Sequence, residues 1–154
     1  MAAATQQNVK GVHLLFQSFG GTVCDGVFLY GLFRSLPIDL TVYNGGSVQS
    51  IAALAFLGAK RRITSRSATF MIHRTMNSPQ FANVSRLKAA TVGVMIDDVR
   101  TEEILRRHLS LTDDKWSELN HNDLFFSGED SIKVGFAQEV GEFSPPLGCP
   151  VYNL

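Results

Sequence analysis

Two short apolar runs in the first half of the chain are each followed by a pair of glycines and then by helical spacing. The runs are residues 12–16 and 40–43, and the helices they precede are predicted at 23–34 and at about 48–57. Short apolar runs bounded by glycine are typical of strands, and repeated strand and helix units are typical of parallel sheets. The repeat therefore predicts an α/β domain with a mostly parallel sheet.

The rest of the chain continues this pattern and then becomes helical. Residues 62–64 and 68–72 are predicted strands. A helical pattern follows over about 83–109, interrupted only by Gly93, which is either a bending point or a place where another helix approaches closely. Asp113 begins a further helix.

The length of the chain limits it to one ordinary domain. With 154 residues, of which 45% are hydrophobic and 18% charged, it can form a single core. We predict one domain over 1–154, with a partial helix at 1–10, a core at 11–140 and a tail at 141–154.

Charge and cysteine content exclude several classes of function. Lys+Arg and Asp+Glu both number 14, so no net charge favours nucleic acid or acidic lipid. Cys24 and Cys149 form no C-x-x-C motif, and neither a disulfide framework nor a metal site is expected. No secretory leader and no run of about 18 apolar residues is present. These features predict a cytoplasmic protein with no membrane partner.

Ser50 is the candidate nucleophile of a hydrolase. Gly45-Gly46 is predicted to turn and Ser47 to cap the next helix, which places Ser50 at its third position. Unpaired N–H groups and the helix dipole favour negative charge there. A serine needs such help because its hydroxyl is a weak nucleophile at neutral pH. An isolated serine in a first turn more often caps or faces solvent, and Ser47 is the rival nucleophile.

His73 is the candidate general base. It follows an apolar strand, which can fix its ring beside a cleft, and polar residues come after it. For any single histidine, partial burial with a bond to a backbone carbonyl is the commoner arrangement. The other histidines have no comparable context: His13, His108 and His121.

Asp123 is the candidate orienting acid. It lies between polar residues and the apolar run 124–126, where its carboxylate could be held at the edge of the core. The alternative is an aspartate that caps a helix or stabilises a turn. Other acidic candidates, interpreted as helix faces or caps, are Asp97, Asp98, Asp113 and Asp114.

The glycine pair Gly20-Gly21 could let the backbone approach a ligand closely, because neither residue has a Cβ. The N–H groups of Gly21 and of Ile51, which follows Ser50, would then form an oxyanion hole. A tight turn between strand and helix explains these glycines equally well.

Together, these segments resemble the Clp-type serine peptidases, which are the proteolytic subunits of caseinolytic protease and their shorter bacterial relatives. The family's glycine motif, commonly Asn-Ser-Pro-Gly-Gly, corresponds to 17–21, and its Gly-x-Ala-Ala-Ser motif to 46–50. Its Met-Ile-His corresponds to 71–73 and its acid segment to 123–127. The order Ser, His, Asp differs from that in chymotrypsin, subtilisin and α/β-hydrolases.

The resemblance implies a crotonase-like Clp fold, with repeated β-α-β units, a long projecting handle helix and no equivalent of the family's first strand. It assigns the catalytic triad to Ser50, His73 and Asp123, and the oxyanion hole to Gly21 and Ile51. No cofactor is implied.

The resemblance also implies a serine endopeptidase that hydrolyses unfolded proteins or peptides within a homo-oligomeric ring. Partner chains should cover the apolar positions of the handle, which are Leu87, Val94, Ile104 and Leu105. In large members, aromatic residues on the strand before the glycine motif lie where unfoldases dock. Here His13 and Leu15 take those positions, which disfavours docking of an AAA+ unfoldase.

Two departures from the family motifs bear on activity. Phe19 replaces the usual proline, and residues 48–49 are larger than the usual small pair, which changes the pocket. The alternative functions are a catalytically inactive or truncated structural subunit of a Clp-like ring and a crotonase-type acyl-CoA enzyme. The intact triad argues against the second.

Overall fold

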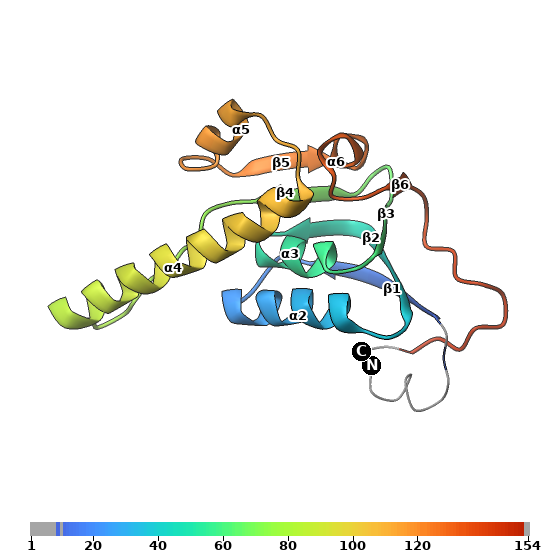
Figure 1. Ribbon diagram of the computed structural model, residues 1–154, viewed down its shortest axis with the longest axis horizontal. Helices are drawn as coiled ribbons and strands as arrows, with labels where there is room; N and C mark the ends of the chain where they lie inside the picture. The colour runs from blue at the N-terminus through green and yellow to red at the C-terminus, as the bar shows by residue number, and fades with distance from the viewer. Residues whose placement is uncertain (1–8, 10, 153–154) are drawn as a thin grey trace.

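This computed structural model describes residues 9 and 11–152, along which strands and helices are interspersed (Figure 1). The partial helix expected at 1–10 falls almost entirely outside this part. The elements in chain order are β1 (Gly11–Ser18), α2 (Val23–Ser35), β2 (Asp39–Gln49), α3 (Ile51–Leu57), β3 (Arg61–Thr64), β4 (Thr69–Ile72), α4 (Val84–His108), α5 (Asp113–Glu118), β5 (Leu124–Ser127), α6 (Gly128–Val134) and β6 (Glu139–Val140).

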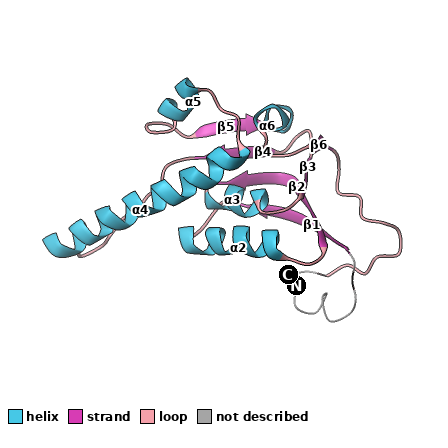
Figure 2. Ribbon diagram, in the orientation of Figure 1, coloured by secondary structure: helices cyan, strands magenta, loops and turns pink. Residues whose placement is uncertain are grey.

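β2 is the central strand of the sheet (Figure 2). It pairs in parallel with β1 along one edge, and its other edge is shared by two strands. Residues 41–44 pair with β3, and residues 47–49 pair with β4, both in parallel. β6 adds to β3 in parallel, whereas β5 is antiparallel to β4. The mostly parallel α/β sheet expected from the sequence is confirmed.

Asn44 holds the point at which β2 changes partner. This residue is fully buried, and its Nδ2 donates to the carbonyl of Thr69 at 3.0 Å. Its Oδ1 accepts from the N–H of Gly46 at 3.1 Å, and its carbonyl accepts from the N–H of Ser65 at 2.9 Å. A buried amide is tolerated only when its groups are paired. Asn44 therefore stabilises the route of β2 toward β4.

The turn expected at Gly45-Gly46 is wrong, and so is the capping role of Ser47. The strand continues through both glycines, and α3 begins only at Ile51. The hydroxyl of Ser47 instead lies 3.1 Å from a threonine hydroxyl of β4. Pairing of residues 47–49 with β4 keeps the backbone extended, which outweighs the local preference of the glycines for a turn. Ser50 consequently occupies the position before the helix rather than its third residue.

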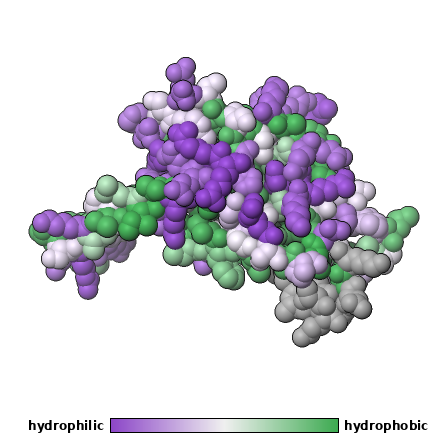
Figure 3. Space-filling model, in the orientation of Figure 1, coloured by the Kyte–Doolittle hydropathy of each residue, from purple (hydrophilic) through white to green (hydrophobic). Residues whose placement is uncertain are grey.

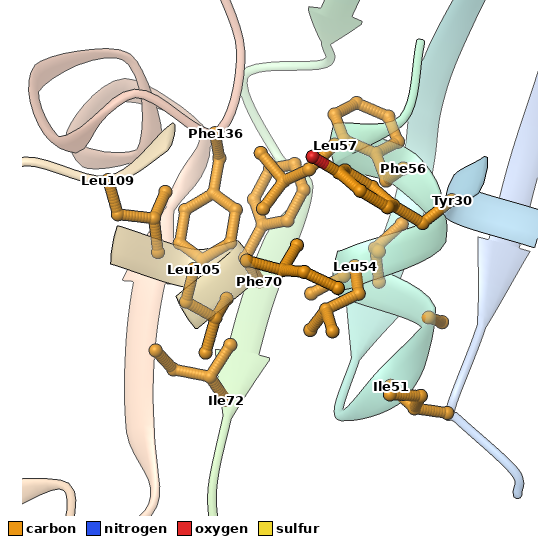
Figure 4. Close-up of a cluster of buried hydrophobic side chains, with 14 of the residues drawn as sticks. Tyr30, Ile51, Leu54, Phe56, Leu57, Phe70, Ile72, Leu105, Leu109 and Phe136 are labelled. Atoms are coloured by element: carbon orange, nitrogen blue, oxygen red, sulfur yellow. The ribbon is translucent and has the colours of Figure 1, made fainter. Parts of the chain in front are cut away.

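The core lies between the sheet and the helices, and every residue of α3 is buried in it. Phe70 of β4 stacks on Phe136 with ring centroids 4.7 Å apart, and Phe56 of α3 packs edge-on against Phe70 at 5.1 Å (Figure 4). Burying a phenylalanine side chain contributes about 1.5–3 kcal/mol. The helix that begins directly after Ser50 is thus firmly anchored.

α4 projects beyond the body of the domain, as the handle expected from the sequence does (Figure 1). The side chain of Asn83 caps its first turn by accepting from the N–H of Arg86 at 3.0 Å. Figure 3 shows apolar surface on the projecting part. The exposed apolar side chains on this helix are Val84, Leu87, Val92, Met95, Ile96 and Val99.

The expectation that only partners could cover Ile104 and Leu105 is wrong. These residues are 7% and 4% exposed within the single chain, because the last turns of α4 pack on the core. Figure 4 shows Leu105 beside Ile72 of β4. The expectation that other chains cover apolar side chains of the handle therefore applies to the projecting part of the helix.

Three further features complete the description. None of the described helices is long and apolar enough to cross a membrane. Cys24 and Cys149 are free and exposed. Residues 141–152, the described part of the expected tail, contain neither helix nor strand.

Candidate active site

Ser50 joins β2 to α3 with an unusual backbone conformation, φ 55° and ψ −132°. Positive φ is uncommon for a residue with a side chain and costs of order 1–3 kcal/mol. Two bonds hold it: its N–H donates to the carbonyl of Met71 at 2.7 Å, and its carbonyl accepts from the N–H of Ala53 at 3.0 Å. Strain of this kind on a strand-to-helix turn is a recurring way to present a nucleophilic serine.

Gly20 lies directly beside the Ser50 side chain. A Cβ on Gly20 would lie 2.8 Å from Cβ and 3.2 Å from Oγ of Ser50, and its φ of 111° favours glycine. The hydroxyl of Ser18 accepts from the N–H of Gly20 at 3.2 Å and holds the loop. The glycine motif therefore allows the backbone before α2 to approach the serine.

Gly26 allows a similarly close approach between α2 and α3, the two helices that flank the site. A Cβ at this position of α2 would lie 2.8 Å from the carbonyl oxygen of Ile51. The glycine thus lets the start of α3 pack closely against α2. This packing fixes Ile51, one of the two predicted oxyanion donors.

A cleft of about 270 Å³ opens beside Ser50. Four of the five predicted site residues line it: Ser50, His73, Gly21 and Ile51. Much of the remaining wall is apolar, and its apolar side chains are Phe19, Val23, Leu54, Ile72, Met76 and Leu105. The fold brings the predicted nucleophile, base and oxyanion donors to one cavity, although they lie far apart in sequence.

His73 follows the last residue of β4, and its Nδ1 lies 2.6 Å from the carbonyl oxygen of Arg74. A carbonyl can only accept, so Nδ1 donates, and in the neutral ring the lone pair is then on Nε2. This is the tautomer that a base acting on a serine hydroxyl needs. His73 therefore makes the backbone-carbonyl contact that is common for a single histidine, and it also lines the cleft.

Asp123 comes directly before β5, and His73 comes directly after β4. The antiparallel register pairs Ile72 with Leu124, so His73 and Asp123 each lie one residue beyond the last pair. However, Asp123 is exposed and lines a different cleft. Within the described part of the chain, no hydrogen bond joins Asp123 to His73 or His73 to Ser50.

The family model for Clp protease matches residues 1–144. The chain belongs to the Clp protease family. This membership and the mixed sheet confirm the α/β Clp fold expected from the sequence. The family supports a peptidase, and its members generally form oligomeric rings and act on peptide substrates.

The other acidic candidates have different roles in this Clp family member. Oδ1 of Asp98 accepts from the N–H of Thr75 at 2.8 Å, and Asp97 pairs with Arg100 at 2.8 Å. The first turn of α5 contains the remaining pair, Asp113 and Asp114.

Two of the other histidines bond elsewhere. Nδ1 of His13 lies 2.9 Å from the hydroxyl of Tyr43, and Nε2 of His108 lies 2.9 Å from that of Tyr30. Burial, together with the positive charge of nearby arginines, lowers the pKa of His108 to about 4.

Arg74 is a residue near the site that sequence reasoning missed. Its guanidinium donates to Glu102 of α4 at 2.5 Å and to the side chain of Asn120 at 2.5 Å. Partial burial acts to raise the pKa of Glu102, but hydrogen bonds from Arg106 and Arg74 outweigh it and lower that pKa from its ordinary value. The only signal in the sequence is a basic residue directly after His73.

Proposed function

We propose that the chain is a serine endopeptidase that cleaves unfolded proteins or peptides through an acyl-enzyme on Ser50. The observation that carries the proposal is the strained Ser50, presented on a strand-to-helix turn in the cleft that also contains His73. Family membership supports the same class of reaction. The roles of individual residues follow from their chemistry and position.

In the proposed reaction, Oγ of Ser50 attacks the carbonyl carbon of the scissile peptide bond while Nε2 of His73 accepts its proton. The N–H groups of Gly21 and Ile51 bind the oxyanion of the tetrahedral intermediate. The intermediate collapses as His73 returns the proton to the leaving amine. Water then attacks the acyl-enzyme with the same base, which releases the second product and restores Ser50.

Asp123 is proposed as the carboxylate that stabilises the His73 imidazolium. The support for this role is that His73 and Asp123 each lie one residue beyond the last pair of β4 and β5, Ile72 and Leu124. Contact between them requires the His73 ring to turn from the carbonyl of Arg74 toward Asp123. The negative charge of Asp123 would then stabilise the ring most while His73 is protonated.

The substrate and the assembly follow from the surfaces around the site. Apolar walls in the cleft fit the side chains of an extended, unfolded segment. The exposed apolar residues of α4 favour association with further copies of the chain, and the proposed assembly is a homo-oligomeric ring.

A non-catalytic subunit of a Clp-like assembly is the second candidate. The observation that favours it is the position of Asp123, which lines a separate cleft while the His73 ring bonds to Arg74. In such a subunit the cleft would lack a functional base, because the imidazolium would have no partner charge.

Hydrolysis assays with the full chain separate the two candidates. Unfolded casein and short fluorogenic peptides are incubated with the wild type, Ser50→Ala and Ser47→Ala. The peptidase predicts turnover by the wild type and by Ser47→Ala, with loss of activity in Ser50→Ala. Equal activity in the wild type and Ser50→Ala would exclude Ser50 as nucleophile. No turnover by any of the three would favour the structural subunit.

A further inference from the structure

We infer that Arg74 is a positioning residue that orients His73 in the cleft beside Ser50, and that it acts through its bonds to Glu102 of α4 and to Asn120. This inference rests on the proposed function and adds a residue to it. Arg74 does not need to touch the substrate for this role. Its effect comes from the segment that it holds in place.

Three nitrogens of the Arg74 guanidinium donate to two partners, one on α4 and one in the turn after α5. Nη1 donates to Oε2 of Glu102 on α4 at 2.5 Å. Nε and Nη2 both donate to Oδ1 of Asn120, at 3.0 Å and 2.5 Å. The planar guanidinium is thereby fixed in orientation, since its donors form a rigid fork.

The ion pair differs from an ordinary surface pair in its surroundings. The side chains of Arg74 and Glu102 are only 26% and 24% exposed. Exposed ion pairs contribute little because solvent screens them and their side chains are free to move. Partial burial and the additional bonds to Asn120 make this pair a firmer restraint.

A second bond ties the same segment to the same helix. The N–H of Thr75 donates to Oδ1 of Asp98 at 2.8 Å. Asp98 and Glu102 are four residues apart on α4 and therefore lie on one face of the helix, one turn apart. Both residues that follow His73 are thus held to α4.

This anchoring reaches the imidazole through the main chain. The carbonyl of Arg74 is the group that lies 2.6 Å from Nδ1 of His73 and fixes its tautomer. A shift of Arg74 would move that carbonyl and change the orientation of the ring in the cleft that also contains Ser50. Asn120 lies three residues before Asp123, so the same guanidinium also restrains the segment that carries the proposed acid.

Arg106 supplies a matched control. Its Nε donates to Oε1 of Glu102 at 2.6 Å, and its guanidinium lies 4.2 Å from the centroid of the Trp116 ring. It therefore shares the carboxylate with Arg74, while its other partner is on α5. Loss of Arg106 perturbs the charge of the cluster without removing the bonds of Arg74 to Asn120.

The experiment compares Arg74→Gln, Arg74→Lys and Arg106→Gln with the wild type in the full chain. The readouts are the rate of Ser50 labelling by a fluorophosphonate, and kcat and KM for a peptide. A displacement of about 1 Å can cost 10²-fold in rate, so we expect Arg74→Gln to lower kcat and the labelling rate by about tenfold or more. KM should change little. Arg74→Lys should have a kcat and a labelling rate between those of the wild type and Arg74→Gln, because lysine can pair with Glu102 but cannot form the same fork. Arg106→Gln should label at close to the wild-type rate.

The tautomer of His73 gives a readout that a purely structural role would not move. In the wild type, ¹⁵N NMR of the labelled ring should show the proton on Nδ1, and Arg74→Gln should show a mixture of tautomers. Circular dichroism confirms that each variant is folded. Should Arg74→Gln fail to fold, Glu102→Gln and Asn120→Ala each remove one tether, and both should lower the labelling rate.

The outcomes separate the inference from the proposed function. Absence of labelling in the wild type would overturn the proposed function and the inference with it. Labelling of the wild type and of folded Arg74→Gln at equal rates, with the same tautomer, would overturn the inference alone. Wild-type labelling rates in both Glu102→Gln and Asn120→Ala would also overturn the inference alone.

Discussion

His73 and Asp123 each lie one residue beyond Ile72 and Leu124, the last paired residues of β4 and β5. The sheet thus brings the segments of the proposed base and the proposed acid to the same end, although the ring of His73 bonds to the carbonyl of Arg74 and Asp123 lines a different cleft. The main-chain carbonyl contacts the imidazole in this structure, and the carboxylate is the group proposed to replace that contact during the reaction. The first fixes the tautomer, and the second can stabilise the charge.

This division predicts the effect of removing the carboxylate. Asp123→Asn should lower the rate of Ser50 labelling, but by less than His73→Ala, because the Arg74 carbonyl still holds the useful tautomer. A general base typically contributes about 10²–10⁴-fold, which sets the scale of the loss in His73→Ala. Asp113→Asn, in the first turn of α5, is the control for a lost surface charge. A loss in Asp123→Asn equal to that in His73→Ala would show that the carboxylate selects the tautomer.

Gly20 provides a steric test of the site. Gly20→Ala should abolish most labelling, because φ of 111° disfavours alanine and its Cβ would lie 2.8 Å from that of Ser50. Gly31→Ala, on α2, is the matched control, because nothing lies within 4 Å of a Cβ there and Gly31 does not line the cleft. Labelling rates of the two variants are compared after each is shown to fold. Equal rates would mean that the glycine loop does not constrain Ser50.

His108 predicts a pH dependence of stability. Its pKa is lowered from 6.5 to about 4 in the folded chain. Between these values the unfolded state binds more protons, so the free energy of unfolding should fall as the pH is lowered from 6.5 to about 4. Urea unfolding at a series of pH values measures this slope. His108→Gln, which cannot titrate, should show a shallower slope over that interval, and an unchanged slope would assign the dependence to other groups.

Gly93 lies within the continuous helix α4, and nothing lies within 4 Å of a Cβ placed there. Gly93→Ala should therefore raise the free energy of unfolding by about 1 kcal/mol, the difference in helix propensity. Thermal unfolding measures this change, and sedimentation of the same variant measures assembly. Weaker assembly would indicate that another chain packs at this glycine. A changed turnover with intact assembly and Ser50 labelling would instead support bending of the handle.

Most strands and helices could be predicted because their apolar spacing is local information. The handle is the clearest case: it was expected at 83–109 and is found at Val84–His108. The path of β2 through Gly45-Gly46 could not be predicted in this way. Asn44 and the pairing with β4 determine it, and both depend on residues more than 20 positions away.

The candidate site shows the same limit. Ser50 and His73 were recognised from short motifs, and the fold places both in one cleft. The strain at Ser50 could not be foreseen, because the bond that holds its N–H comes from Met71, 21 residues along the chain. Nor could the role inferred for Arg74, whose partners Glu102 and Asn120 lie 28 and 46 residues along the chain. Such contacts leave no local pattern in a sequence.

Mapping of a fluorophosphonate adduct by mass spectrometry tests the central claim most directly. The wild type, Ser50→Ala and Ser47→Ala are treated with the probe in the full chain, and the modified peptide is sequenced. The account predicts one adduct per chain, on Ser50, in the wild type and in Ser47→Ala, and none in Ser50→Ala. An adduct on another residue, or equal modification of the wild type and Ser50→Ala, would contradict it.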